Sequence, residues 1–179
     1  GALVGLTIAQ LKREGTPVIL PGQGGSALDM QTLVDPYVRP DCQGVHETLA
    51  HWYGLPMFTT AGASDAKLGD QQAGIEAALT LLVDGLAGGN IIHDLGYLES
   101  GLCGSLVQLT ICNEIVAWIK ALKSDVEISD ETLAVGVVDD VGPDGEFMSC
   151  EHTLQHFRDR WYPQLFERDD YEGWLAKGG

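Results

Sequence analysis

Residues 55–94 read LPMFTTAGASDAKLGDQQAGIEAALTLLVDGLAGGNIIHD. Residues 55–60 form a short apolar run that ends at Ala61-Gly62, as is typical of a buried strand. A helical pattern then runs from Asp70 to about residue 86, with an apolar face made by Ile75, Leu79, Leu82 and Leu86. Residues 90–94 make a second strand-like run. A strand, a helix and a strand in this order predict a parallel βαβ unit.

The same alternation extends toward the N-terminus. Residues 2–14 have helical spacing that Gly15 ends, and residues 16–20 form a strand-like run that closes at Pro21-Gly22. Residues 43–53 predict a helix that ends at the following glycine. We therefore expect one more strand on this side, with a helix before it and a helix after it.

Helices are expected over most of the C-terminal part. Ser105 is placed to cap a helix that runs to about residue 123, whose buried face is made by Leu106, Leu109, Ile115 and Ile119. Residues 130–141 predict another helix, and the more polar helical segment from residue 151 has two anchors, Trp161 and Trp174. A complete (β/α)₈ barrel takes about 250 residues, so the alternation predicts part of a barrel or a small open α/β sheet.

The composition excludes several classes of partner. The chain has 179 residues, and its 10 Lys and Arg against 26 Asp and Glu give a formal net charge of −16. Such a surface repels nucleic-acid phosphates and anionic lipid headgroups, so neither nucleic acid nor a membrane is expected as a partner. The chain lacks an initiator methionine and starts within a helical pattern, which predicts a fragment of a larger protein.

The cysteines fit a reducing, cytoplasmic compartment. The four of them, Cys42, Cys103, Cys112 and Cys150, are far apart and form no CxxC pair, which disfavours a zinc motif or a redox motif. Cys103 and Cys112 fall in or beside an apolar helix and are expected to be small core residues.

Three loops that contain small and polar residues follow the predicted strands, at residues 22–30, 59–67 and 93–101. Because working groups in parallel α/β folds lie at the carboxyl ends of strands, we expect the three loops to form one ligand site. Small residues let the backbone approach a ligand, and polar residues supply hydrogen bonds or charge. The candidate substrate-binding residues are Gln23, Asp29, Phe58, Asp65, Lys67, His93, Tyr97 and Glu99.

Some of these residues also have plain structural interpretations. Ser64 or Asp65 can cap the following helix and leave Lys67 in solvent, or Asp65 and Lys67 can lie in the cleft as charge partners of each other or of a substrate. Adjacent strand side chains point to opposite faces, so His93 and Asp94 are not expected to form a dyad. A lone, satisfied histidine is the simpler interpretation of His93.

Aromatic residues near strand ends are candidates for binding a quaternary ammonium ion through cation–π attraction. Phe58 and Tyr97 hold such positions. Trp52 and Tyr53 lie inside a predicted helix and are interpreted as core residues.

Two further motifs are interpreted as structural. GQGG, at residues 22–25, lacks the rest of a dinucleotide-binding fingerprint and is interpreted as a glycine-rich turn. His152 and His156, in HTLQH, have a spacing that can bind a metal, but no glutamate lies between them. Capping or interface roles are expected for this pair, and no metal site is predicted.

Four segments carry a family resemblance: GTPVIL (15–20), GLPMFTTAGASDAKLGDQQAGIEAALTLLVDGLAGGNIIHDLGYLESGL (54–102), VQLTICNEIVAWIKAL (107–122) and EHTLQHFRDRWYPQLFERDDYEGW (151–174). They resemble the trimethylamine methyltransferase family over almost the whole chain. The motifs SDAK with QQAG, YLESG and the EHT…HFR tail occur in the order that this family shows.

The resemblance implies the C-terminal part of a (β/α)₈ TIM barrel. Residues 1–150 would form a partial barrel, and residues 151–179 a helical C-terminal extension packed on it. Members of the family transfer a methyl group from a methylated amine to the cob(I)alamin of a separate corrinoid protein. The implied partners are therefore a methylated amine, a corrinoid protein and further copies of the chain, with no cofactor bound directly and no activity of the fragment alone.

The resemblance also bears on the substrate. Trimethylamine-specific members carry pyrrolysine, which is absent here, and relatives without it resemble quaternary-amine enzymes such as those for glycine betaine. A quaternary nitrogen is already activated as a leaving group, so a betaine-type methyl donor is expected, whose carboxylate Gln23, Lys67 or His93 would hold. The alternative is a non-catalytic small-molecule-binding or oligomerisation module of the same fold. Unpaired sheet edges in a fragment also predict self-association.

Overall fold

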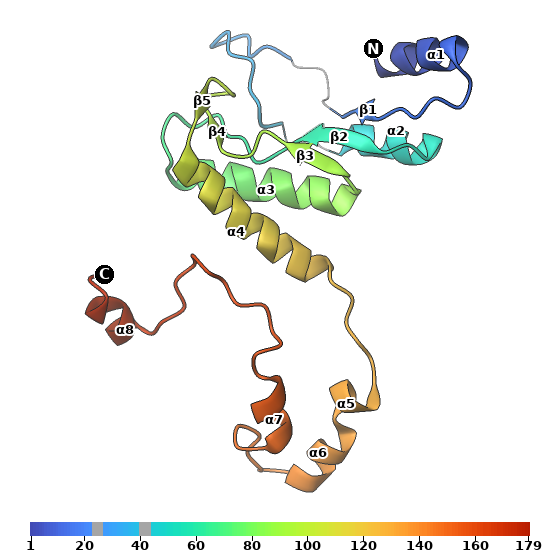
Figure 1. Cartoon of the computed structure of the whole chain (residues 1–179). Helices are drawn as coiled ribbons and strands as arrows, with labels where there is room; N and C mark the ends of the chain where they lie inside the picture. The colour runs from blue at the N-terminus through green and yellow to red at the C-terminus, as the bar shows by residue number, and fades with distance from the viewer. Residues whose placement is uncertain (23–26, 40–43) are drawn as a thin grey trace. The chain divides into compact units, whose positions relative to one another are not determined.

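The computed structural model describes residues 1–22, 27–39 and 44–179 of the chain. These residues divide into two compact units, Gly1–Ile119 and Lys120–Gly179. The first unit contains α1 (Ala2–Lys12), β1 (Leu20–Pro21), α2 (Val45–Tyr53), β2 (Met57–Thr60), α3 (Gln71–Ala87), β3 (Ile91–His93), β4 (Tyr97–Leu98), β5 (Cys103–Gly104) and most of α4 (Leu106–Lys123) (Figure 1). The second contains α5 (Asp130–Leu133), α6 (Val135–Val141), α7 (Glu151–His156) and α8 (Tyr171–Ala176).

The first unit is built on a parallel sheet with the strand order β1-β2-β3. Phe58 of β2 pairs with Pro21 on one side and with Ile91 on the other, and Thr60 pairs with His93. The connections α2 and α3 follow β1 and β2 in the chain. The predicted alternation of parallel strands and helices is therefore confirmed for this unit.

Side-chain alternation gives the sheet a covered face and an open face. Leu20 and Met57 point to the covered face, where they pack with Ala50 of α2. Phe58, which has the opposite orientation, is 40% exposed. The open face at β2 and β3 therefore carries Phe58 and, beyond it, the Thr60–His93 pair.

A polar contact inside the covered face ties three elements together. The Thr59 hydroxyl lies 3.0 Å from Oε1 of Glu47, in α2, and 2.7 Å from Oδ2 of Asp84, in α3. All three side chains are buried. Because both helices reach the same strand residue, they must lie on the same side of the sheet.

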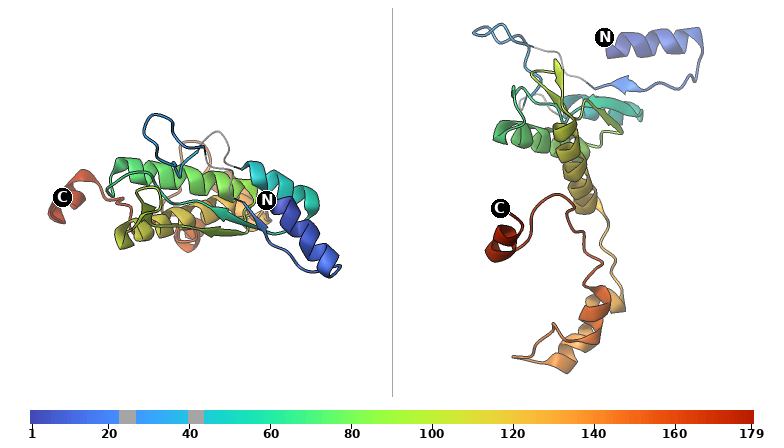
Figure 2. Two further views of the ribbon diagram at one scale, coloured as in Figure 1. Left: turned by 90° about the horizontal axis from the view of Figure 1, so that it is seen from above. Right: turned by 60° about the vertical axis from the view of Figure 1, so that its left-hand side comes forward.

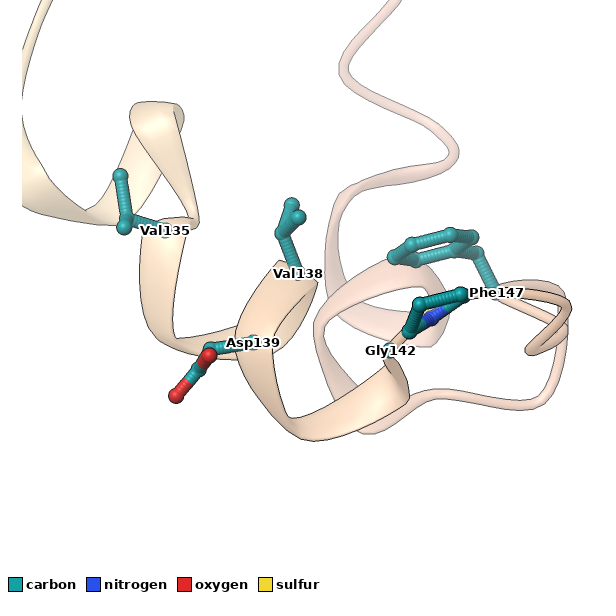
Figure 3. Close-up of a pocket in the computed structure, with 6 residues that line it drawn as sticks. Val135, Val138, Asp139, Gly142 and Phe147 are labelled. Atoms are coloured by element: carbon teal, nitrogen blue, oxygen red, sulfur yellow. The ribbon is translucent and has the colours of Figure 1, made fainter.

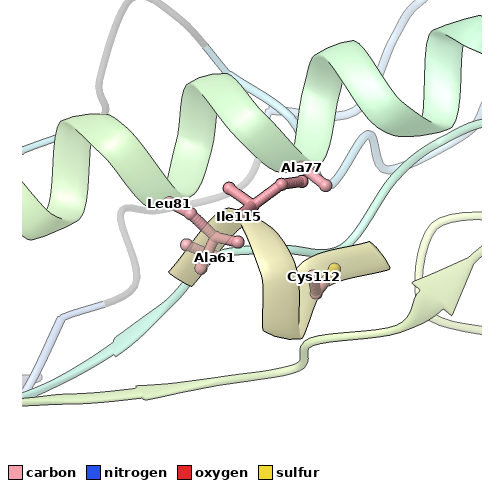
Figure 4. Packing of buried hydrophobic residues seen from close by; sticks show 5 residues of the cluster. All are labelled: Ala61, Ala77, Leu81, Cys112 and Ile115. Atoms are coloured by element: carbon pink, nitrogen blue, oxygen red, sulfur yellow. The ribbon is translucent and has the colours of Figure 1, made fainter. Parts of the chain in front are cut away.

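The main apolar cluster lies between α3, α4 and the end of β2. Its buried members are Ala61, Ala77, Leu81, Cys112 and Ile115 (Figure 4). Small side chains at the contact let α3 and α4 approach closely, and Figures 1 and 2 show the two helices against each other. The N-cap of α3 is Asp70, whose carboxylate accepts a hydrogen bond from the Ala73 amide.

Sequence periodicity gave the wrong buried face for α3. Its larger side chains Ile75, Leu79 and Leu86 are 59%, 57% and 63% exposed, and the buried face is formed by residues such as Ala73 and Ala77. Most of the buried residues of α3 are small, which allows close packing, and Leu81 is the one large apolar side chain among them.

The predictions for α4 and the cysteines are borne out in part. Ile115 and Cys112 are buried as expected, but Leu106 is 82% exposed and Leu109 is 43% exposed. Cys103 lies in β5, outside the helix, and is exposed, so the prediction that it is a core residue is wrong.

The second unit is less helical than expected. The helix predicted over residues 130–141 is divided at Ala134, whose φ of 48° ends α5 before α6 begins. Residues 151–179 form two six-residue helices, α7 and α8, joined by non-helical chain. The division of the chain at residue 150, and the packing of the tail on a barrel, stay predictions.

In the three described stretches of the chain, no helix is both long enough and apolar enough to cross a membrane.

Candidate functional site

The loops after β2 and β3 run side by side beyond the ends of the strands. The Ala61 amide donates to the His93 carbonyl (3.1 Å), and the Ser64 amide donates to the Tyr97 carbonyl (2.9 Å). The Glu99 amide completes the set with a 2.8 Å hydrogen bond to the carbonyl of Ala66. The second and third predicted loops therefore lie together at the carboxyl edge of the sheet.

His93 lies at this edge with all of its polar atoms engaged. Its Nδ1 is 2.7 Å from Oδ1 of Asp94, and its Nε2 is 3.1 Å from the Thr60 hydroxyl. The imidazole stacks on the Phe58 ring, with centroids 4.0 Å apart and an interplanar angle of 11°. Phe58 and His93 thus form a face-to-face stack on the open face of the sheet, in which each ring covers one π face of the other.

The expectation that His93 and Asp94 do not form a dyad is wrong. The alternation rule applies within a strand, but β3 ends at His93, and Asp94 has a φ of 73°. This left-handed backbone turns the carboxylate back toward the imidazole.

Burial shifts both members of the pair away from their charged forms. It lowers the pKa of His93 and raises the pKa of Asp94. A neutral imidazole that donates from Nδ1 to Asp94 leaves Nε2 free to accept the Thr60 hydroxyl proton, so both contacts are satisfied by one tautomer.

Tyr37 reaches the same site from the connection between β1 and α2. Its hydroxyl donates a hydrogen bond to Oδ2 of Asp94. Its ring lies against Gly101, where a Cβ atom would be 3.0 Å from Cε2 of the tyrosine. Sequence analysis missed Tyr37, because the segment around it has no helical or strand periodicity.

Asp65 joins the loop after β2 to the segment before α2 and to the turn between β4 and β5. Its carboxylate accepts hydrogen bonds from the amides of Tyr37 (2.7 Å) and Val38 (3.2 Å) and from the Ser100 hydroxyl (2.9 Å). These donors occupy the carboxylate, which makes Asp65 a positioning residue for the loops.

Neither interpretation of Ser64, Asp65 and Lys67 holds in full. Asp70, and not Ser64 or Asp65, caps α3. Lys67 is exposed, and its Nζ donates to the carbonyl oxygen of Asp65 (2.7 Å) instead of forming an ion pair with the carboxylate. Ser64 instead donates to Glu76 of α3 (2.6 Å), a further residue that sequence analysis missed.

The side chains of the remaining described candidates are exposed or make local contacts. Tyr97 is 40% exposed in the β4–β5 hairpin, and Glu99 is exposed with a φ of 52°. Asp29 forms a local turn in which Oδ1 accepts the amides of Gln31 (2.7 Å) and Thr32 (3.2 Å). Gln23 lies outside the described residues.

The second unit has a separate hollow of about 480 Å³. It is lined by Val135, Val138, Asp139, Gly142, Pro143 and Phe147 (Figure 3). Its ionisable residue, Asp139, directs the carboxylate away from the Val138 and Phe147 side chains (Figure 3). The hollow therefore offers apolar surface without the converging polar groups of the first unit.

The first unit thus combines two stacked aromatic rings with a hydrogen-bonded carboxylate. Aromatic faces attract organic cations, and a nearby carboxylate adds a charge of the opposite sign. Tyr37 and His93 both hydrogen-bond to Asp94, so the carboxylate has a fixed orientation. This arrangement can attract a small organic cation.

Comparisons with known proteins give a consistent result. The model of the trimethylamine methyltransferase (MTTB) family matches residues 1–179. The trimethylamine methyltransferase MttB of Desulfitobacterium hafniense strain DCB-2 is 35% identical over 99% of this chain and 36% of its own length. That of Methanosarcina thermophila is 35% identical over 98% of this chain and 37% of its own length. A glycine betaine methyltransferase of D. hafniense strain Y51 is 30% identical over 98% of this chain and 37% of its own length. The chain thus spans little more than a third of the relatives it matches.

Proposed function

The chain belongs to the trimethylamine methyltransferase family, and we propose that it is part of an enzyme that transfers a methyl group from a quaternary amine to a corrinoid protein. The observation that carries the proposal is the stacked Phe58–His93 surface beside the hydrogen-bonded Asp94 carboxylate. This surface lies at the carboxyl edge of a parallel sheet, where α/β enzymes place their active sites.

The proposed substrate follows from the charge that the surface can bind. Phe58 and the neutral His93 each have one π face outside the stack that can contact N-methyl groups, and Asp94 offers a carboxylate. A quaternary amine carries its positive charge at every pH, so no residue has to protonate it before the methyl group leaves. The relatives include both trimethylamine methyltransferases and a glycine betaine methyltransferase, and we propose glycine betaine because residues 1–179 contain no pyrrolysine and a permanent cation suits this surface.

The transfer breaks the N–CH₃ bond and leaves its electron pair on nitrogen, while the methyl carbon bonds to the incoming nucleophile. The positive charge on nitrogen disappears in this step, so very strong cation binding would stabilise the substrate more than the transition state. A carboxylate already hydrogen-bonded by Tyr37 and His93 attracts the cation less than a bare one would. The residues of this site would therefore act mainly by orienting the N-methyl group.

The rest of the enzyme is proposed to complete the site. The strands β1, β2 and β3 are parallel and adjacent in chain order, as consecutive strands of a (β/α)₈ barrel are. In such a barrel the open face that carries Phe58 would face the interior. We place the remaining strands in the part of the protein that lies beyond this chain, and the methyl-accepting cob(I)alamin on a separate corrinoid protein.

A direct assay tests the proposal. The intact protein is mixed with cob(I)alamin and one of glycine betaine, carnitine or trimethylamine, and methylcobalamin is followed by its absorption spectrum. We expect methylation from one quaternary amine by the intact protein and none by residues 1–179 alone. Binding of a quaternary amine without any methyl transfer, with cofactor that is active in a control reaction, would contradict the catalytic proposal.

A further inference from the structure

A second cluster of ligand-type side chains lies in the second unit, between α5 and α7. It consists of Glu131, His152 and His156, and one ligand atom of each lies within 4.8 Å of the others. Oε1 of Glu131 is 3.1 Å from Nε2 of His156 and 3.9 Å from Nε2 of His152. The two imidazole centroids are 4.6 Å apart.

These distances fit a tetrahedral metal. Zinc binds imidazole nitrogen and carboxylate oxygen at about 2.0–2.2 Å, which places neighbouring ligand atoms about 3.3–3.5 Å apart. The two carboxylate–imidazole separations, 3.1 and 3.9 Å, lie on either side of this range. The His152–x₃–His156 spacing brings both rings to one side of a single helix turn.

Asp159 is placed to accept the hydrogen bond that a metal-binding histidine usually donates from its other ring nitrogen. Its Oδ2 is 2.7 Å from Nδ1 of His156. A hydrogen bond from Nδ1–H to this carboxylate leaves Nε2, the atom nearest Glu131, as the lone-pair donor. Nε2 of His156 and the Glu131 carboxylate then both present lone pairs at 3.1 Å, an arrangement that needs a proton or a metal ion between them.

The second unit also lacks an apolar core that would hold α5 and α7 together. Of residues 120–179, all of which the structure describes, Pro163 alone is buried. Chain segments of this size with too little buried apolar surface are commonly stabilised by a bound metal, whose binding energy adds to folding.

We propose that Glu131, His152 and His156 bind a divalent transition-metal ion of the zinc type, with water in the fourth position. The ion would join α5 to α7 and stabilise the second unit. His152 would give up its 2.8 Å hydrogen bond from Nε2 to the Glu131 carbonyl and change tautomer, so that Nδ1 carries the ring proton and the Nε2 lone pair is free to bind the metal. The site is independent of the Phe58–His93 surface, so neither proposal requires the other.

Metal titration of the full 179-residue chain tests the proposal. After dialysis against EDTA, the chain is titrated with Zn²⁺ in competition with a chromophoric chelator, and separately with Co²⁺. We expect one equivalent of Zn²⁺ with a dissociation constant in the micromolar range or below, and the visible bands of tetrahedral Co²⁺. Absence of stoichiometric binding, or an octahedral Co²⁺ spectrum, would overturn it.

Matched variants assign the ligands. Glu131→Gln and His156→Gln should each weaken Zn²⁺ binding by at least tenfold, and Asp159→Asn by about 10- to 100-fold, as measured for other outer partners. His46→Gln, which removes an imidazole from α2, should leave the affinity unchanged. Equal affinity in all of these variants would show that Zn²⁺ binds elsewhere and overturn the assignment.

Hydrogen exchange tests the metal site in the unmodified chain, so its result does not depend on whether a variant folds. In the unmodified chain, Zn²⁺ should slow amide exchange in α5 and α7, which the metal would join. It should leave exchange in α2 and α3 unchanged. Slowing confined to other segments, or no slowing at saturating Zn²⁺, would contradict a metal site between these two helices.

Discussion

The His93 imidazole lies face to face with the Phe58 ring, at a centroid distance of 4.0 Å and an interplanar angle of 11°. Register explains the contact, because Phe58 and Thr60 lie on one face of β2 and His93 pairs with Thr60. The stack is fixed at its polar end by Asp94 and by the Thr60 hydroxyl. A binding surface made of two rigid rings requires little ordering when a ligand arrives.

Replacing Phe58 tests the role of the stacked surface. In the intact protein, Phe58→Leu keeps an apolar side chain but removes the π face. Loss of a cation–π contact of about 0.5–2 kcal/mol should raise KM for the quaternary amine roughly 2- to 30-fold, with a smaller change in kcat. The matched control is Phe147→Leu, because Phe147 is similarly exposed (43% against 40%) but lies in the second unit. Equal effects of both substitutions would contradict a specific role for Phe58.

The lowered pKa of His93 predicts a pH-dependent stability. Its ordinary pKa is 6.5, and burial favours the neutral form in the folded chain. His93 therefore contributes stability above pH 6.5 that is lost as the pH falls through the lower pKa of the folded state. The free energy of unfolding, measured by urea titration between pH 7.5 and 5, should fall less steeply in His93→Gln than in the unmodified chain.

Asp94 contributes a pH dependence of the opposite sign to the free energy of unfolding, and both proteins contain it. Burial raises its pKa above 3.8, so its contribution is present at low pH and is lost as the pH rises. The difference between the two proteins thus reports on His93. His46→Gln serves as the control, and the same slope in His93→Gln and the unmodified chain would contradict a half-buried His93 that is kept neutral.

Asp65 should contribute to the stability of the fold and not to ligand binding, because its carboxylate is occupied by hydrogen bonds within the chain. Asp65→Ala removes the acceptor for two amides and one hydroxyl, which should lower the free energy of unfolding by about 1–3 kcal/mol. Amide exchange at Tyr37 and Val38 should accelerate. Lys67→Ala, at an exposed side chain two residues away, should change stability by less than about 0.5 kcal/mol. A larger loss in Lys67→Ala than in Asp65→Ala would contradict this assignment.

Replacing Thr59 tests the polar contact on the covered face of the sheet. Thr59→Val keeps the shape of the side chain but removes the contact to Glu47 and Asp84. We expect a loss of about 1–3 kcal/mol in the free energy of unfolding, because two buried carboxylates lose a hydrogen-bond partner. Thr110→Val, at an exposed position in α4, is the control. Unchanged stability in Thr59→Val would show that the hydroxyl is dispensable.

The helices and strands of the first unit could be predicted from sequence because the residues that begin and end them lie next to them in the chain. The start of α3 follows from the Asp70 cap, and the end of α2 follows from Gly54, which has a φ of 61°. Strands β2 and β3 follow from short apolar runs between breakers. Each of these signals lies within a few residues of the element that it defines.

The polar contacts of the site could not be predicted, because they depend on backbone turns and distant segments. The Asp94 contact requires a left-handed φ at Asp94, the residue directly after the end of β3. Tyr37 reaches Asp94 across 57 residues of sequence. The buried face of α3 was missed for a related reason, since it is made by small residues and Leu81, and not by Ile75, Leu79 and Leu86.

The most direct test of the amine-binding surface is a crystal structure of the intact protein with glycine betaine bound. The account predicts the ammonium nitrogen within about 6 Å of the Phe58 centroid, with an N-methyl group directed away from the sheet. A betaine bound at a position where it contacts neither Phe58 nor His93 would contradict the account.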